Sequence, residues 1–314
     1  MPQTFPKTNW ALILGGSSGF GLASAAKLAS HGMNLIIFHR DRRGAMGRIE
    51  EDFAALRNEG IEVLTFNADA LSSEVRDEKL NEIAEHLGDD RIHLLLHSIA
   101  FGNLKLSVAE KPADDSAVCA LAERLDIEVE KLQTAADEVF SGGADRLQLL
   151  ATPPKYSATL FLEEEDLART IHAMGTSLLG WVQAIHGRGL FAADSRVLGL
   201  TSEGNTIAWK GYAAVAAAKV ALESVARSIA VEFAPYGIRC NVLQPGVTET
   251  PALRLIPGNA HLKAEARSKN PFGRLTQPED VADMVYLMAQ PEAAWVNGAL
   301  IRVDGGEHVS GVRQ

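Results

Sequence analysis

Short apolar blocks alternate with stretches of helical periodicity over most of the chain. The strand-like blocks are residues 10–16, 33–39, 61–69, 91–100, 194–202, 238–246 and 298–306. Apolar residues at helical spacing occupy 22–32, 44–60, about 73–87 and 212–234. Each strand-like block is apolar on both faces, which is typical of a strand that is covered on both sides. The alternation therefore predicts an α/β fold in which helices wrap a parallel sheet.

The alternation lapses between about 103 and 160. Residues 113–143 carry apolar side chains at helical spacing, with Asp114, Asp115 and Ser116 as N-cap candidates and a glycine pair at the end. From Ala109 to Leu147 there are 10 acidic and 4 basic residues, a net charge of −6. We predict an acidic, mostly helical insertion after the fourth strand. It is either a solvated helical segment or a lid or partner surface, because ligands bind at the carboxyl ends of such strands.

The first strand is followed by the glycine-rich sequence GGSSGFG, which opens a helix. Glycines at 15, 19 and 21 permit a tight turn and let phosphate oxygens approach the backbone at a helix N-terminus. A strand, such a turn and a helix in succession indicate dinucleotide binding. The residues expected there are Gly15, Ser17, Ser18, Gly19, Phe20 and Gly21.

The second strand ends in FHRDRR, where an acidic residue would bind the ribose 2′-hydroxyl of NAD. His39 occupies that place, Arg40 follows it, and Arg42 and Arg43 lie close behind. Guanidinium groups suit a 2′-phosphate, so we expect NADPH rather than NADH, although a solvated basic loop gives the same pattern. Asp69, at the end of the third strand, is expected near the adenine.

Composition narrows the function classes. The chain has 314 residues, a net charge of −10 and a pI of about 5.4, which argues against binding to nucleic acid or to an anionic membrane. Two cysteines and nine histidines show no metal-site spacing. The N-terminal MPQTFPKTNW lacks the features of a signal peptide, and no apolar run reaches transmembrane length. We expect a cytoplasmic protein without a bound metal.

Several of these residues together resemble the short-chain dehydrogenase/reductase family. The resemblance rests on the three glycines, Asp69, Ser202, Lys219, PGVTET at 245–250 and VDGG at 303–306, and covers about 1–102 and 160–308. It implies one dinucleotide-binding reductase domain over 1–314, a doubly wound parallel sheet, a nicotinamide cofactor and a homotetramer. The family's usual catalytic set is Asn, Ser and Tyr-x3-Lys. Here Val215 stands in the tyrosine position and Met174 in the asparagine position.

Tyr212 lies seven residues before Lys219, and this Tyr-x6-Lys spacing resembles the enoyl-acyl-carrier-protein reductase branch of the family. So do HSIAF at 97–101 and the substrate-binding loop at 249–275. The resemblance implies reduction of the C=C bond of a trans-2-enoyl thioester in fatty-acid biosynthesis, catalysed by Tyr212, Lys219 and Ser202. It also places further residues at the cofactor, namely Ala70, Ser98, Ile99, Ala100, Pro245, Gly246, Thr248 and Thr250. Glu203 and the 103–160 insertion are not part of the resemblance.

Three readings of the function stay open: an enoyl-thioester reductase, a carbonyl reductase with an atypical proton donor, and a nucleotide-binding regulatory protein without turnover. Residues 251–275 carry a net charge of +4 on an otherwise acidic chain. Its cations are Arg254, Lys263, Arg267, Lys269 and Arg274. Such a surface would attract an acidic acyl carrier protein, although a solvated loop has the same composition.

Overall fold

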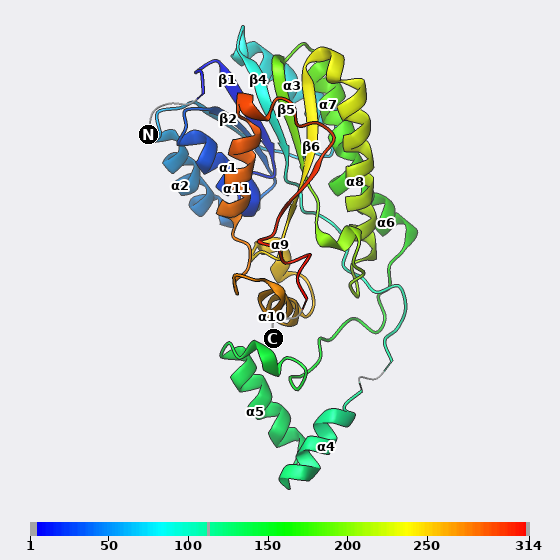
Figure 1. Ribbon diagram of the computed structural model, residues 1–314. Coiled ribbons are helices and arrows are strands. Elements are labelled where there is room, and N and C mark those ends of the chain that lie inside the picture. Colours follow the sequence, from blue (N-terminus) through cyan, green and yellow to red (C-terminus); the bar gives the residue numbers. More distant parts are fainter. Residues whose placement is uncertain (1–4, 112–113, 312–314) are drawn as a thin grey trace.

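Seven parallel strands form one sheet in the computed structural model, which describes residues 5–111 and 114–311 (Figure 1). The strand order is β3-β2-β1-β4-β5-β6-β7, so the direction of winding reverses between β1 and β4. The strands are β1 (Asn9–Leu14), β2 (Asn34–His39), β3 (Val63–Asn67), β4 (Arg91–His97), β5 (Phe191–Leu200), β6 (Ile238–Pro245) and β7 (Leu300–Val303). The predicted doubly wound α/β fold is confirmed.

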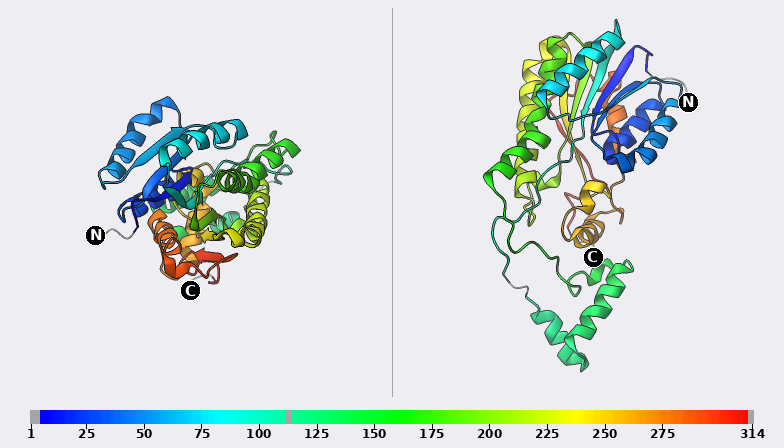
Figure 2. Two further views of the ribbon diagram at one scale, coloured as in Figure 1. Left: turned by 90° about the horizontal axis from the view of Figure 1, so that it is seen from above. Right: turned by 180° about the vertical axis from the view of Figure 1, so that it is seen from behind.

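Helices cover both faces of the sheet (Figures 1 and 2). One face packs against α1 (Gly19–Ala29), α2 (Met46–Arg57) and α11 (Pro278–Met288). The other packs against α3 (Ser73–Leu87), α7 (Ser177–Gly187) and α8 (Ala213–Glu232). The five inner strands are mostly buried because their side chains meet apolar helix faces on both sides, whereas the edge strands β3 and β7 are partly exposed. None of the helices in the described part of the chain is both long and apolar enough to cross a membrane.

A π-helical turn, His172–Thr176, joins α6 (Glu164–Ile171) to α7. Gly175 lies in this turn, where a Cβ atom would come 2.7 Å from the carbonyl oxygen of Ala218. The absence of a side chain therefore lets the turn pack directly onto α8. Turns of this kind are frequent at functional sites, and this one places Met174 beside the start of α8.

The insertion contains two helices, α4 (Ser116–Leu125) and α5 (Val129–Ser141), where the apolar spacing predicted one helix over 113–143. Residue 113 lies outside the described residues. The prediction of a single helix is wrong, because Asp126 adopts a left-handed conformation (φ 54°) that ends α4. Aspartate tolerates this conformation better than most residues. Gly142 and Gly143 end α5 as expected. The helix pair stands beyond the carboxyl ends of the strands, away from the sheet (Figures 1 and 2).

Shorter elements connect the strands and the longer helices. They are α9 (Pro251–Arg254), α10 (Asn259–Lys269) and the short turns η1 (Arg43–Ala45), η2 (Asp145–Leu147), η4 (Glu203–Asn205), η5 (Ala234–Tyr236) and η6 (Pro291–Ala293). The predicted substrate-binding loop at 249–275 is thus partly helical, and a proline begins its first helix. It lies next to η2 of the insertion, against which α10 packs.

Candidate active site

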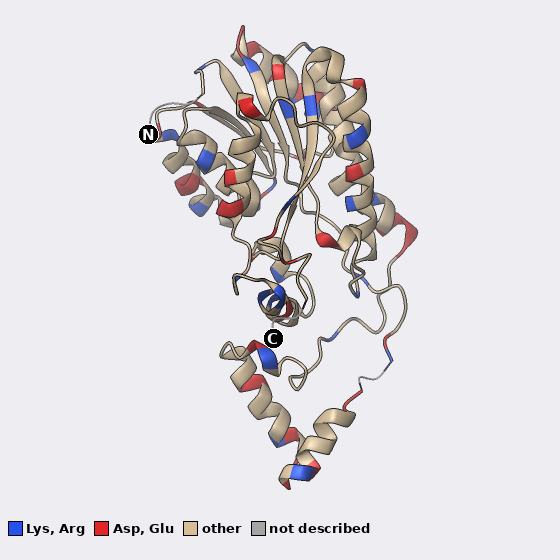
Figure 3. Cartoon of the chain, viewed as in Figure 1, with Lys and Arg blue, Asp and Glu red and all other residues tan. Residues whose placement is uncertain are grey.

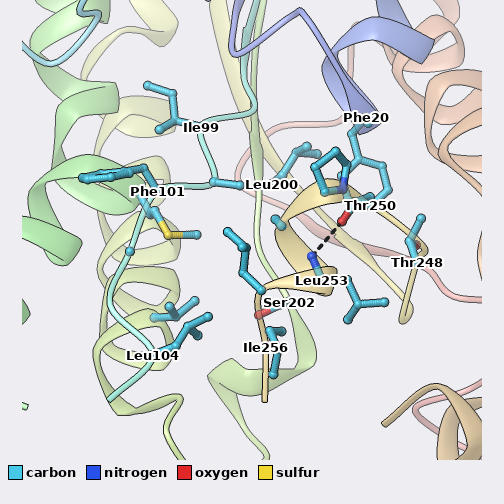
Figure 4. A pocket seen from close by; sticks show the side chains of 18 of the residues that line it. Phe20, Ile99, Phe101, Leu104, Leu200, Ser202, Thr248, Thr250, Leu253 and Ile256 are labelled. Carbon is cyan, nitrogen blue, oxygen red and sulfur yellow. Dashed lines mark hydrogen bonds between the residues drawn. The ribbon is translucent and has the colours of Figure 1, made fainter. Parts of the chain in front are cut away.

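A cleft of about 810 Å³ opens at the carboxyl ends of the strands. Figure 4 shows Phe101 and Leu104 on one side of it, Leu253 and Ile256 on the other, and Ser202 between them. All of the predicted site residues except Gly21 line this cleft, within the part of the chain that the structure describes. Gly21 lies underneath the glycine-rich turn instead. The structure therefore brings together residues that the sequence spreads from Gly15 to Thr250.

The glycine-rich turn is shaped by close backbone contacts. A Cβ atom at Gly15 would lie 2.6 Å from the carbonyl oxygen of Ser98, and one at Gly21 would lie 2.1 Å from that of Gly15. Gly15 and Gly19 have φ values of 85° and 53°, which favour glycine. Ser18 at the N-cap makes no capping hydrogen bond through its side chain within the described residues. The first amides of α1 are thus left for a ligand, and the turn fits a diphosphate.

The adenosine end of the cleft carries both signs of charge. His39 is buried, and its Nδ1 lies 2.9 Å from a carboxylate oxygen of Asp41. Arg40 donates to Asp69 at 2.8 Å, and its guanidinium group lies 5.5 Å from the centre of the Phe101 ring. His39 is thus packed inward, and of the two predicted residues only Arg40, which is 60% exposed, has a largely accessible side chain.

Tyr212 and Ser202 form the polar centre of the cleft. Their hydroxyl oxygens lie 3.4 Å apart. Gly204 makes this approach possible, because a Cβ atom there would lie 2.5 Å from Cε1 of the Tyr212 ring. Burial raises the pKa of Tyr212, the Ser202 hydrogen bond opposes this, and the Glu203 carboxylate adds to it. Tyr212 is therefore protonated at neutral pH and can act as a hydrogen-bond donor.

Lys219 is buried on α8, and its Nζ donates to the carbonyl oxygen of Leu200 at 2.8 Å. Burial lowers the pKa of Lys219 to about 8. His97, at the end of β4, does not line the cleft, and its Nε2 lies 2.9 Å from the Ser177 hydroxyl. Burial, together with the charge of Lys219, lowers the pKa of His97 to about 3. His97 is thus a neutral, packed residue, while Lys219 lines the cleft.

Val215 and Met174 form an apolar wall in the positions where the family usually has tyrosine and asparagine. Both are buried, both line the cleft, and they pack against Ala173, Ala218 and Leu104. Neither side chain can donate or relay a proton. Met174 therefore contributes to the packing around the cleft.

Thr248 and Thr250 belong to the turn that follows β6. The Thr248 hydroxyl donates to the carbonyl oxygen of Gly246 at 2.9 Å. The Thr250 hydroxyl oxygen accepts from the amide of Leu253 at 3.2 Å and so caps α9. Its proton stays available for a ligand, and its methyl group lies against Gly19 of the phosphate turn. The 245–250 turn therefore borders both the phosphate end and the polar centre of the cleft.

Glu307 supports this turn from behind, and the sequence reasoning missed it. Its Oε1 accepts from the amide of Val247 at 3.1 Å, and Oε2 has no hydrogen-bond partner among the described residues. Burial raises the pKa of Glu307 to about 7. A buried carboxylate 60 residues along the chain from its partner leaves no local pattern that could have revealed it.

The basic residues of the substrate-binding loop are paired with carboxylates. Arg254 and Lys263 both contact Glu249, at 2.7 and 2.9 Å. The other three pairs are Arg267 with Asp145, Lys269 with Glu265 and Arg274 with Asp280. Figure 3 shows acidic and basic positions close together around α10. The positive surface expected from the sequence is therefore largely neutralised.

The fold and the cleft together define an α/β oxidoreductase that binds a dinucleotide at the switch point of its sheet. Residues 9–116 match the family model described as short chain dehydrogenase, and residues 113–308 match the one described as Enoyl-(Acyl carrier protein) reductase. The chain belongs to the short-chain dehydrogenase/reductase family.

Individual relatives differ in the chemistry that their names state. A tropinone reductase homolog of Arabidopsis thaliana is 27% identical over 96% of this chain and 91% of its own length. A cis-4-hydroxycyclohexanecarboxylate dehydrogenase of Sinomonas cyclohexanicum is 35% identical, but over only 38% of this chain and 45% of its own length. The structure of the NADH-dependent enoyl-[acyl-carrier-protein] reductase of Aquifex aeolicus matches 97% of this chain and 98% of its own, with 20% identity and a TM-score of 0.69. At this identity the structural likeness bears on the fold alone.

Proposed function

We propose that this protein reduces the C=C bond of a trans-2-enoyl thioester with NADPH. The observation that carries the proposal is the hydroxyl pair of Tyr212 and Ser202, 3.4 Å apart, in a cleft where Val215 makes the position four before Lys219 apolar. An apolar residue there removes the proton donor that carbonyl reduction uses in this family. The retained hydroxyls fit a reaction that needs donors at an oxygen atom carrying negative charge.

Tyr212 and Ser202 would act on the thioester oxygen. Hydride addition to the β-carbon of an enoyl thioester moves negative charge onto this oxygen, giving an enolate. Hydrogen-bond donors fixed in a water-poor cleft stabilise such charge more than water does. Because burial keeps Tyr212 protonated, its hydroxyl can donate throughout the reaction. The α-carbon then takes up a proton from solvent, and the thioester C=O bond re-forms, which leaves a saturated thioester.

The cofactor fits the residues at the other end of the cleft. When bound, NADPH would supply the hydride. The amides behind Gly15 and Gly19 would hold its diphosphate, and Lys219 would hold the nicotinamide ribose. Arg40 would contact the 2′-phosphate after leaving Asp69, an exchange that costs little because exposed ion pairs are weak. The positive charge of Lys219 would also favour the developing enolate.

A matched pair of tyrosine variants tests the reaction. NADPH oxidation is followed at 340 nm with a trans-2-enoyl thioester and, separately, with the corresponding 3-ketoacyl thioester. Loss of one donor at a developing oxyanion lowers kcat by about 100-fold or more, so we expect that effect for Tyr212→Phe with unchanged NADPH affinity. Tyr236→Phe, which alters an exposed tyrosine, is the control. Oxidation with the ketoacyl substrate alone, or equal activity of Tyr212→Phe and wild type, would refute the proposal.

Ketone reduction is the second candidate, because the tropinone reductase homolog aligns over 96% of this chain. It requires Tyr212 to protonate the substrate oxygen from outside the usual position. Oxidation with small cyclic ketones but not with enoyl thioesters would favour it. Absence of turnover with every substrate, despite NADPH binding, would favour the regulatory reading.

The cofactor preference has its own test. In Arg40→Ala the Kd for NADPH is expected to rise about tenfold while that for NADH stays the same, because only NADPH carries the 2′-phosphate. Arg57→Ala, on the solvent side of α2, serves as the control. An equal change in both Kd values would place Arg40 away from the phosphate.

The carrier of the acyl group is a further part of the proposal. Since the cations of the 249–275 loop are paired, long-range attraction of an acidic carrier protein is weaker than the sequence implied. We therefore expect coenzyme A thioesters and carrier-protein thioesters to give kcat/KM values within about tenfold of each other. The homotetramer implied by the family resemblance is tested by light scattering on the same preparation.

A further inference from the structure

The 103–160 insertion reaches the mouth of the cleft through the segment 151–161, here called the strap. Its side chains alternate: Pro154 and Tyr156 are partly buried and line the cleft, whereas Pro153 and Lys155 are exposed. In a fully solvated segment, no side chains would be expected to line the cleft. The alternation indicates that the strap is a wall with an inner and an outer side.

The strap contacts both sides of the cleft mouth at glycines. Tyr156 packs on Gly211, where a Cβ atom would lie 3.2 Å from Cε1 of its ring, and its hydroxyl donates to the carbonyl oxygen of Lys210 at 3.4 Å. Pro154 packs on Gly258, where a Cβ atom would lie 2.4 Å from its Cγ. Residues 210–211 directly precede Tyr212, and Gly258 belongs to the substrate-binding loop. The strap thus bridges the two walls between which a substrate would enter.

The insertion is fixed at its root and near its helix pair. At the root, Leu106 forms a parallel bridge with Phe161, and the amide of Leu162 donates to the carbonyl oxygen of Leu106 at 2.8 Å. Farther out, Arg267 of α10 makes two hydrogen bonds of 2.6 Å to the carboxylate of Asp145. Anchors at both ends hold the strap across the mouth.

Thr152 ties the strap to the helix pair. The carboxylate of Asp137 on α5 accepts from the amide and from the hydroxyl of Thr152, both at 2.6 Å. The Phe140 ring of the same helix lies 5.0 Å from the His261 ring of α10, and His261 lines the cleft. The helix pair therefore positions the strap rather than standing free of it.

We propose that Pro154 and Tyr156 form the outer wall of the substrate cleft and set the length of the acyl chain that it accepts. The proposal rests on the proposed function, which assigns this end of the cleft to the acyl chain. The surrounding lining is mainly apolar, with Leu104, Trp209, Leu255, Ile256 and Leu262. An apolar chain that extends from the Ser202–Tyr212 centre would meet the Tyr156 ring at the mouth.

Two variants of Tyr156 test the proposal in opposite directions. We measure kcat/KM for trans-2-enoyl coenzyme A thioesters from 4 to about 16 carbons. One methylene in an apolar pocket changes discrimination by roughly tenfold or more, so Tyr156→Ala should raise the long-to-short ratio of kcat/KM by at least that factor. Tyr156→Trp should lower it. Lys155→Ala, on the outer side of the strap, should leave the ratio unchanged. A chain-length profile that is the same in wild type, Tyr156→Ala and Tyr156→Trp would overturn the proposal.

A binding measurement separates this proposal from the proposed function. The proposed function fails if none of the enoyl thioesters supports NADPH oxidation by the wild-type protein. In that case, calorimetry in the presence of NADP⁺ measures the affinity for saturated acyl coenzyme A thioesters of the same lengths. The dependence of this affinity on chain length tests the wall without requiring turnover. A shift of the length preference in Tyr156→Ala supports the wall, and equal preferences in Tyr156→Ala and wild type overturn it.

Discussion

The difference in the free energy of unfolding between Glu307→Gln and wild type should shift in favour of the variant as pH rises. Burial raises the pKa of the Glu307 carboxyl from 4.5 to about 7. A carboxyl whose pKa is raised in the folded state binds more protons there than in the unfolded chain, so stability is lost as pH rises from about 4.5 to about 7. The full difference corresponds to about 3 kcal/mol, and most of it falls between pH 5 and pH 8.

The assay compares the free energies of unfolding in urea for wild type and Glu307→Gln at pH 5 and pH 8. The glutamine keeps the acceptor for the Val247 amide and replaces the partnerless Oε2 by an amide group. Any cost of burying that group is the same at both pH values and cancels in the difference. The variant should therefore gain about 2–3 kcal/mol relative to wild type on going from pH 5 to pH 8.

Exposed Glu292 provides the control, because Glu292→Gln should show the same pH dependence as wild type. Identical pH dependence in wild type and Glu307→Gln would mean that the carboxyl ionises as it does in the unfolded chain. That result would refute the assignment of Glu307 as a buried acid beneath the 245–250 turn. An added activity measurement would show whether the charge on Glu307 affects the turn that borders the cofactor.

Two further predictions concern the catalytic centre. Gly204→Ala should lower kcat by about 100-fold with NADPH affinity unchanged, because its Cβ would lie 2.5 Å from the Tyr212 ring and force the hydroxyl to move. Gly47→Ala, whose Cβ would meet no atom within 4 Å, is the control. Equal kcat values for Gly204→Ala and wild type would contradict the contact. Lys219 is charged below its pKa of about 8, so NADPH affinity should begin to fall above that pH, by up to about tenfold per pH unit. Titration by calorimetry should show no such decline in Lys219→Met, and a parallel decline in both proteins would exclude Lys219 as its cause.

The parts of the fold set by short-range patterns followed from the sequence. The helix predicted at 73–87 is α3, Ser73–Leu87, and each predicted strand overlaps one strand of the sheet. The glycine-rich turn could be located because a tight turn between a strand and a helix needs glycine at fixed spacings. These features depend on residues within a few positions of one another, which a single sequence displays directly.

Features that depend on distant residues did not follow from the sequence. Arg267 donates a hydrogen bond to Asp145, 122 positions away in the sequence, and Glu307 accepts one from the amide of Val247, 60 positions away. Counting charges in residues 251–275 alone therefore gave a basic surface. Its cations are neutralised by carboxylates, and Asp145, Glu249 and Asp280 lie outside that stretch. The break at Asp126 was hidden for a related reason, since apolar spacing continues through it from α4 into α5.

Tyr212 and Lys219 both line the cleft, but Tyr212 is positioned there by a loop and not by the predicted helix. The helix predicted over 212–234 would include Tyr212 and place it on the same face as Lys219, seven positions further on. In the structure α8 begins at Ala213, so Tyr212 precedes the helix and is placed by the loop that packs it against Gly204 and Ser202. The same loop carries Lys210 and Gly211, which the strap contacts through Tyr156. Glu110, in another part of the insertion, forms an ion pair of 2.8 Å with Lys210. The insertion therefore contacts the short loop that positions the Tyr212 hydroxyl. A substrate that displaces the Tyr156 ring would act on the segment that holds the Tyr212 hydroxyl, so chain length should affect kcat as well as KM.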